Sequence, residues 1–367
     1  MRLSFVVPNL LTWDGERPIT GGLERFTWHL IDAARDAGYE VDVHQNGSSD
    51  WQRTVRGVRV EGHGLARISP LAALESIHHR AERCVYLSIL QEPQAFRPGS
   101  LVVSHGVWWD GKGMQAQAQA QLHLCRSVLE QAAEVVSVDY NFLQVMRATF
   151  PDFAERITVI PNPVDTEDFY PPAQRGGTPT VLFPRRIDPA RGADLFLEAI
   201  GPLLSAWPAM RAVLAVDAND PGKTEDLRVR LDAAPFAGRA ELVCAPFDAM
   251  PELYRSADIV VIPSLYSEGT SLSLLEALAS GCAVLATDVG GMTNIVLDGF
   301  NGLLVPPRAQ PLREALERLI ADAPLRARLG ENARASAEAF SLPRWRTAWQ
   351  KALRRVYGEP DAAGAGA

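Results

Sequence analysis

Short apolar runs rich in β-branched residues alternate along this chain with segments in which apolar residues recur every three or four positions. The first pattern is typical of strands buried on both faces of a parallel sheet, and the second of helices that pack against such a sheet. Repeated strand–helix–strand order predicts an α/β fold of βαβ units. The runs that read as strands are residues 3–7, 41–43, 85–89, 101–104, 133–138, 180–183, 212–216 and 258–263.

This alternation breaks once, at residues 170–179, where proline, glycine and polar residues are typical of a linker. It restarts at residues 180–183, as expected of a second doubly wound, Rossmann-like domain. We therefore expect an N-terminal domain at residues 1–170 and a C-terminal domain at residues 171–341.

The loop and helix start that follow residues 258–263 carry the densest candidate chemistry. Glu268 and Glu276 are separated by seven residues, and Thr270 or Ser271 is placed to cap a helix that begins there. The free N–H groups and positive dipole end of such a helix form a site for phosphate, and carboxylates accept hydrogen bonds from sugar hydroxyls. The spacing fits a nucleotide sugar, and a capped helix with two solvated glutamates accounts for it equally well.

The segment 268–284 resembles the E-x7-E signature of the retaining glycosyltransferases of family 4, and the similarity continues through residues 287–291 and 298–307. Members have the GT-B fold, in which two Rossmann-like domains face each other across a cleft. The resemblance implies that Glu268 binds donor-sugar hydroxyls and Glu276 the ribose. It also implies that the helix start contacts the donor, through Gly269, Thr270, Ser271 and Leu272.

Two further loops complete the donor site that the resemblance implies. Arg186 and Arg191 stand where the family places an arginine and a lysine on the diphosphate, while the role of Arg185, at a family glycine position, stays open. Fixed cations there would stabilise the charge that builds on the leaving diphosphate; a solvated arginine loop is the alternative. Gly21 and Gly22 resemble the family's first glycine loop, which faces the donor phosphates and the acceptor.

His105 follows the predicted strand 101–104, at the sheet edge where ligands of open α/β sheets bind. It resembles the family histidine beside the reacting sugar, although a lone histidine is often structural. Aromatic rings with nearby carboxylates suit a sugar-like acceptor, and packing of the tryptophans in the core is the equally weighted alternative. The acceptor-side candidates are Trp13, Asp14, Trp108, Trp109 and Asp110.

The last predicted helix, residues 342–357, has an apolar stripe with two tryptophans, bordered by basic residues. The resemblance implies that it crosses back onto the N-terminal domain. Weak peripheral association with an anionic membrane is the alternative. Residues 358–367 are expected to form a disordered tail.

Composition narrows the expected partners and location. No apolar run approaches the roughly 18 residues that span a bilayer, and the four cysteines form no C-x-x-C pair. Reduced thiols in the cytoplasm are therefore expected. The chain has a net charge of −8, and its first 170 residues hold 15 basic and 21 acidic groups, a difference of 15 − 21 = −6. We expect no nucleic-acid partner, and an acceptor that is neutral or cationic.

By resemblance, the chain is expected to move a hexose-type sugar from a UDP- or GDP-sugar to a hydroxyl of a glycan, a lipid-linked glycan or a small molecule, with retention. No cofactor or metal is expected, because arginines and a helix start already neutralise the diphosphate. A non-catalytic nucleotide-sugar-binding protein, or an epimerase or phosphorylase of the same fold, are the alternatives. The expected catalytic residues are His105, Arg186, Arg191 and Glu268.

Overall fold

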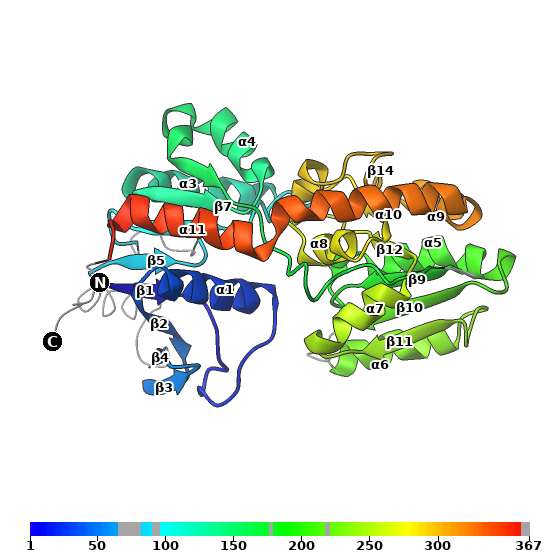
Figure 1. Cartoon of the computed structure of the whole chain (residues 1–367), viewed down its shortest axis with the longest axis horizontal. Helices are drawn as coiled ribbons and strands as arrows, with labels where there is room; N and C mark the ends of the chain where they lie inside the picture. Colours follow the sequence, from blue (N-terminus) through cyan, green and yellow to red (C-terminus); the bar gives the residue numbers. More distant parts are fainter. Residues whose placement is uncertain (65–81, 90–95, 176–178, 217–220, 361–367) are drawn as a thin grey trace. The chain divides into compact units, whose positions relative to one another are not determined.

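The computed structural model describes residues 1–64, 82–89, 96–175, 179–216 and 221–360 (Figure 1). It divides into two compact units, each built on its own sheet. The first unit comprises Met1–His105, Lys112–Pro161 and Pro343–Ala367, and the second comprises Gly106–Gly111 and Asn162–Leu342. Both are Rossmann-like α/β units, which confirms the predicted fold class.

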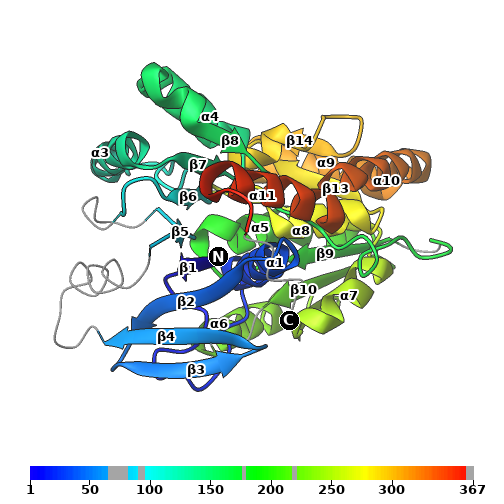
Figure 2. The same ribbon diagram turned by 60° about the vertical axis from the view of Figure 1, so that its left-hand side comes forward.

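The first unit contains, within the described residues, an eight-stranded sheet in the order β3-β4-β2-β1-β5-β6-β7-β8. Neighbouring strands are parallel except β3 and β4, which form an antiparallel hairpin at one edge (Figure 2). The strands are β1 (Arg2–Val6), β2 (Glu40–Gly47), β3 (Trp51–Val55), β4 (Val58–Gly64), β5 (Cys84–Tyr86), β6 (Leu101–Ser104), β7 (Glu134–Ser137) and β8 (Ile157–Val159). The helices are α1 (Gly22–Asp36), α3 (Gln115–Gln131), α4 (Tyr140–Thr149), the 3-10 helix η2 (Pro151–Arg156) and α11 (Leu342–Tyr357).

Helix α11 packs against the first unit from Pro343 onward. The Trp345 and Trp349 rings lie 5.3 and 5.6 Å from the Phe26 ring of α1, and both tryptophans are buried. At the end of the helix, the Tyr357 hydroxyl donates to the Cys84 carbonyl and accepts from the backbone N–H of Leu101. The predicted apolar stripe is therefore buried in protein, and it is not available to a membrane surface.

The second unit contains a fully parallel six-stranded sheet in the order β11-β10-β9-β12-β13-β14, counted over the described residues. Its strands are β9 (Thr180–Pro184), β10 (Arg211–Val216), β11 (Ala240–Cys244), β12 (Ile259–Ile262), β13 (Ala283–Thr287) and β14 (Leu303–Val305). Its helices are α5 (Ala193–Ala206), α6 (Pro221–Asp232), α7 (Met250–Ser256), α8 (Leu272–Ala279), α9 (Ala309–Ala321) and α10 (Ala323–Ala337), with the 3-10 helices η3 (Pro189–Arg191), η4 (Phe247–Ala249), η5 (Gly290–Asn294) and η6 (Glu338–Phe340).

The central strands of this second sheet are buried on both faces. Along β12, Ile259 and Val261 join one hydrophobic core, and Val260 and Ile262 join the other. Successive side chains of a strand point to opposite faces, so a strand covered by helices on both sides needs apolar residues at every position. This requirement explains the unbroken apolar run of Ile259–Ile262.

The boundary between the units lies earlier than the linker composition predicted. The second unit begins at Asn162, because Val164 and Phe169 are buried in its core, where the Phe169 ring lies 5.6 Å from that of Tyr254. The start of the predicted tail is also held in place, since the Gly358 carbonyl accepts a hydrogen bond from Tyr39. Residues 361–367 lie outside the described part. No described helix is long and apolar enough to cross a bilayer.

Candidate active site

Three neighbouring strands of the second sheet bring the candidate loops together. Strands β9, β12 and β13 are adjacent and parallel, so the loops that follow them emerge at one edge. In open α/β sheets ligands bind at this edge. The loop after β9 carries the arginines, the loop after β12 carries Glu268, and the loop after β13 carries Gly290 and Gly291.

Glu268 is the point at which these loops meet. Its Oε2 atom accepts hydrogen bonds from Arg185 Nη2 at 2.5 Å, Arg191 Nη1 at 2.6 Å and Ser264 Oγ at 2.6 Å. The residue is only 5% exposed. Two guanidinium groups on one buried carboxylate oxygen fix its position firmly, since hydrogen bonds between charged groups are stronger than those between neutral ones.

Arg185 is the buried cation of the cluster. Its Nη1 atom also donates to Ser271 Oγ at 2.9 Å, so the guanidinium bridges Glu268 and the start of α8. Burial lowers the pKa of Arg185 from its usual value, and the nearby charge of Glu268 acts in the opposite direction. Arg186, which the sequence pattern selected, is exposed. The contact with Glu268 is made by Arg185 and Arg191.

Two glycines allow the loops to approach each other this closely. Gly192 has a φ of +74°, and a Cβ atom there would lie 1.9 Å from the carbonyl oxygen of Pro263. Gly290 has a φ of +50°, and its Cβ would lie 2.1 Å from the carbonyl oxygen of Glu268. Any larger residue would clash with backbone and adopt a strained conformation. The next residue, Gly291, donates its N–H to that Glu268 carbonyl at 2.8 Å.

Helix α8 begins as predicted, with Ser271 as its N-cap. The Ser271 hydroxyl accepts from the N–H of Leu274 at 3.4 Å as well as from Arg185. The segment before it is held by Asn162 Nδ2, which donates to the Thr270 carbonyl at 2.7 Å. Gly269 and Leu272 are partly exposed, so backbone N–H groups at this positive helix end are positioned near the surface for an anion.

Glu276 lies in the second turn of α8 and is 4% exposed. Its Oε2 atom accepts a hydrogen bond from the Tyr254 hydroxyl at 2.9 Å. Burial raises the pKa of Tyr254 well above its usual value, and Glu276 raises it further. Because Glu268 and Glu276 are both buried and hydrogen-bonded, the alternative of two solvated glutamates on a capped helix is wrong.

Comparison with known proteins shows the family to which this chain belongs. The family model described as "Glycosyl transferases group 1" matches residues 164–336, and the model described as "Glycosyltransferase Family 4" matches residues 20–168. A D-inositol 3-phosphate glycosyltransferase of Stackebrandtia nassauensis is 34% identical over 382 residues, which cover 89% of this chain and 85% of the relative. The chain belongs to glycosyltransferase family 4.

The same name recurs among other similar sequences, and the solved structures agree on the fold. A D-inositol 3-phosphate glycosyltransferase of Acidothermus cellulolyticus is 36% identical over 204 residues, 51% of this chain, and this match spans about half (45%) of the relative. Sucrose-phosphate synthase of Thermosynechococcus elongatus has a TM-score of 0.79 at 21% identity and covers 98% of this chain and 100% of its own. The HepE protein of Anabaena, solved with UDP, has a TM-score of 0.74 at 18% identity and covers 97% of this chain and all of its own. The fold of this family 4 glycosyltransferase is therefore GT-B.

In the first unit of the glycosyltransferase, His105 is a neutral ring. Burial lowers its pKa to about 4, against a smaller opposite effect of its hydrogen bond to the Leu87 carbonyl. Its Nε2 atom lies 2.8 Å from that carbonyl oxygen, which requires the proton on Nε2 and leaves Nδ1 as an acceptor. The ring packs edge-on against Phe26 at 5.0 Å. Gly21 is the N-cap of α1, where a Cβ would lie 2.3 Å from Glu24 Oε2.

The acceptor-side candidates are distributed over both units. Trp13 and Asp14 belong to the first unit, where Trp13 is 50% exposed and donates its Nε1–H to Asn9. The segment Gly106–Gly111 belongs to the second unit, where Asp110 Oδ1 accepts from the N–H of Ser267 at 2.8 Å. Trp108 is exposed and Trp109 is buried. Of these two tryptophans, only Trp109 therefore packs in the core.

Sequence reasoning missed four residues that support the two glutamates. Arg185 was left without a role, although it adjoins the predicted arginine loop. Ser264 directly follows the predicted strand 258–263, and a polar residue at a strand end is a signal that could have selected it. The other two residues are Asn162 and Tyr254. No local sequence pattern marks them, because only folding brings them next to α8.

Proposed function

We propose that this family 4 glycosyltransferase transfers a hexose-type sugar from a UDP- or GDP-linked donor to an acceptor hydroxyl, with retention of configuration. The observation that carries the proposal is the cluster of Arg185, Arg191 and Glu268 beside the start of α8. It combines cations, free helix N–H groups and a fixed carboxylate, which are the groups that a diphosphate joined to a sugar requires. The relatives' names support a glycosyltransferase, and the solved complex of HepE with UDP-glucose supports the donor class.

In the proposed reaction the bond between the sugar C1 and the diphosphate oxygen breaks, and the electron pair leaves with the nucleotide diphosphate. The acceptor oxygen forms the new bond to C1 on the same face, and its proton passes to a donor phosphate oxygen. Arg191, Arg186 and the N–H groups at the start of α8 would stabilise the charge on the leaving group. Stabilisation of this kind acts mainly in the transition state and therefore raises kcat.

The remaining side chains would orient the donor. Glu268, held through Oε2 by its guanidinium partners, would accept from hydroxyls of the donor sugar, and Glu276 would accept from the ribose. His105 would present the acceptor Nδ1 atom beside the reacting sugar. We propose that no metal ion takes part, since the arginines and the helix end supply the positive charge, and that the enzyme acts in the cytoplasm. The acceptor would be a hydroxyl of a neutral or cationic glycan, lipid-linked glycan or small molecule.

The configuration of the product tests this proposal. The enzyme is incubated with a UDP-sugar of known anomeric configuration and an acceptor in excess EDTA, and the product is examined by NMR. The proposal predicts transfer with an unchanged anomeric configuration. An inverted product would contradict the mechanism. Turnover that stops in EDTA and returns only with a divalent cation would contradict the metal-free step, and donor binding without transfer or hydrolysis would favour a non-catalytic binding protein.

A further inference from the structure

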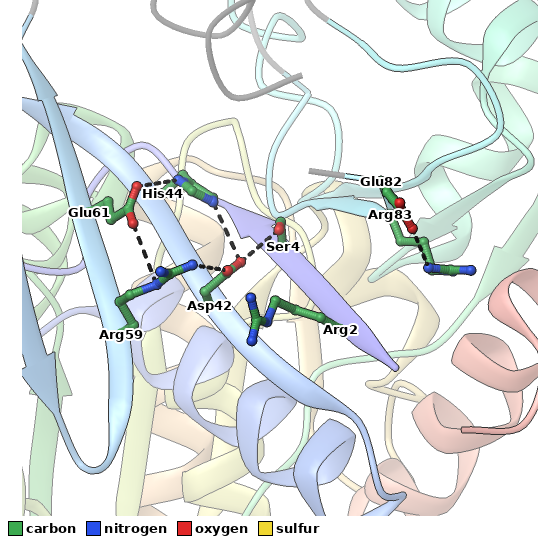
Figure 3. A pocket seen from close by; sticks show the side chains of 8 residues that line it. All are labelled: Arg2, Ser4, Asp42, His44, Arg59, Glu61, Glu82 and Arg83. Carbon is green, nitrogen blue, oxygen red and sulfur yellow. Dashed lines mark hydrogen bonds and ion pairs between the residues drawn. The ribbon is translucent and has the colours of Figure 1, made fainter. Parts of the chain in front are cut away.

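One face of the first sheet carries polar side chains where a buried sheet usually carries apolar ones. Val43 of β2 and Val60 of β4 are paired in register and fully buried on the opposite face. On the polar face Asp42, His44 and Glu61 line a cavity of about 350 Å³ (Figure 3). The register places His44 directly beside Glu61, and period-two alternation brings His63 to the same face as Glu61.

Three metal-binding atoms converge on this face. His44 Nδ1 lies 3.0 Å from His63 Nε2 and 3.6 Å from Glu61 Oε2, and all three ligand atoms lie within 4.8 Å of one another. In a tetrahedral zinc site, with bonds of about 2.0–2.1 Å, the ligand atoms are roughly 3.3–3.4 Å apart. The two separations from His44 Nδ1, 3.0 and 3.6 Å, lie on either side of this value. Elsewhere in the described residues, no other set of three such side chains converges.

The second nitrogen of His44 faces a carboxylate that fixes the ring. Its Nε2 atom lies 3.5 Å from Asp42 Oδ1, and Asp42 is itself held by the Ser4 hydroxyl at 2.6 Å. Its other ring nitrogen, Nδ1, is directed at Glu61 Oε2 and His63 Nε2. Histidines that bind metals commonly donate their other N–H to a carboxylate in this way.

Arg59 holds both carboxylates beside His44 in place. Arg59 Nη2 lies 2.8 Å from Asp42 Oδ2, and its Nε lies 3.4 Å from Glu61 Oε1. The guanidinium therefore contacts Asp42 Oδ2 and Glu61 Oε1. The other oxygens, Asp42 Oδ1 and Glu61 Oε2, are directed at His44 (Figure 3). Arg2, Arg83 and Glu82 line the rest of the cavity, whose charged side chains are three arginines and three carboxylates.

We propose that His44, Glu61 and His63 form a zinc site in the first unit. Two imidazole nitrogens and one carboxylate oxygen form a donor set that suits Zn²⁺ and leaves one coordination position for water. The ion would join β2 to the β3–β4 hairpin at the edge of the sheet. It would stabilise the native state, since a ligand that binds only the folded protein lowers its free energy. The proposal gives the ion a structural role and no step of sugar transfer.

Zinc stoichiometry and affinity test the proposal directly. Full-length protein without an affinity tag is stripped with a chelator, loaded with ZnCl₂, desalted and analysed for metal, and Co²⁺ is used as a visible probe of the coordination sphere. We expect one Zn²⁺ per chain and a zinc-dependent rise in Tm. Glu61→Gln and His63→Gln should each lower the zinc affinity by at least about 100-fold, as loss of a direct ligand exceeds the 10–100-fold effect of an outer-shell partner.

His123→Gln is the matched control, because His123 is exposed on α3, and it should bind zinc as the wild type does. His63→Gln should retain turnover with the sugar donor and a normal circular dichroism spectrum. The proposal is overturned if the wild type retains no zinc, or if His63→Gln and His123→Gln bind it equally. It is also overturned if affinity depends on His78 and His79, which lie outside the described residues, and not on His63.

Discussion

Arg185 Nη2 lies 2.5 Å from Glu268 Oε2, within a pair whose side chains are both more than nine-tenths buried. The same oxygen accepts from Arg191 and Ser264, so the contacts that the described residues make with this carboxylate all fall on Oε2. In the proposed donor site, Oε1 is therefore the oxygen available to a sugar hydroxyl. The cluster would fix the orientation of this proposed donor-binding group before the donor arrives, which would reduce the cost of binding.

The first prediction concerns the stability of this pair. Glu268→Ala leaves Arg185 buried without its carboxylate, and removing one partner of a buried ion pair typically costs about 3–5 kcal/mol. Urea unfolding followed by circular dichroism should show a loss of this size. The double variant Arg185→Met with Glu268→Ala should recover part of it, because no buried charge then remains. A double variant no more stable than Glu268→Ala would show that the two residues are not coupled.

The second prediction concerns the leaving group. Arg191→Ala should lower kcat by about 10²–10³-fold, the effect of losing one preorganised donor to a developing anion. Steady-state kinetics with the donor at saturation measure it. Arg318→Ala is a suitable control because Arg318 is exposed on α9 of the same unit. Near-normal turnover in Arg191→Ala would remove this residue from the diphosphate site.

The third prediction separates binding from catalysis at Glu276. A hydrogen bond to a charged group contributes about 1.5–3 kcal/mol, so Glu276→Ala should raise the donor KM by roughly 10–100-fold. Its effect on kcat should be small, since a ribose contact is the same in the ground state and the transition state. Tyr254→Phe keeps the carboxylate and should change KM less. A fall in kcat at unchanged KM would contradict the ribose assignment.

The fourth prediction follows from the pKa of about 4 for His105. The unfolded chain, with a histidine pKa near 6.5, takes up a proton between pH 6.5 and 4 that the folded protein does not. The contribution of His105 to stability should therefore fall with decreasing pH across this window, by about 1.4 kcal/mol per pH unit and roughly 3 kcal/mol in all, and this contribution should level off below pH 4.

Comparison with His105→Gln isolates this contribution, because glutamine can still donate to the Leu87 carbonyl and does not titrate. The stability difference between the wild type and the variant should change across pH 6.5–4 and be constant from pH 7 to pH 8. A difference independent of pH throughout would mean that His105 titrates alike in the folded and unfolded states.

Much of the fold was predictable because its signals are local. The strand Ile259–Ile262 is apolar at every position, since β12 is buried on both faces, and Ser271 caps α8 through its own hydroxyl. The alternation of such runs with helices was enough for two Rossmann-like units. The hairpin of β3 and β4 was not predicted, because its exposed positions carry polar and charged residues in a pattern that resembles a loop.

The candidate site was predictable only in part, because burial is decided by tertiary packing. Arg185 and Arg186 are adjacent and chemically identical, and no periodicity shows which of them turns toward Glu268. Val164 and Phe169 lie in a short irregular segment, so their packing into the second unit could not be read from spacing. The zinc-site residues are separated in sequence, and only the register of β2 and β4 places His44 beside Glu61.

The most direct test of the central claim is a thermal-shift panel with UDP, GDP, ADP and their common sugars, run in EDTA on the wild type, Arg191→Ala and Arg318→Ala. A ligand that binds only the native state raises Tm. We predict a selective rise with one nucleotide class in the wild type and Arg318→Ala, and a much smaller rise in Arg191→Ala. No rise with any nucleotide, or an equal rise in Arg191→Ala, would contradict a donor site built on the cluster of Arg185, Arg191 and Glu268.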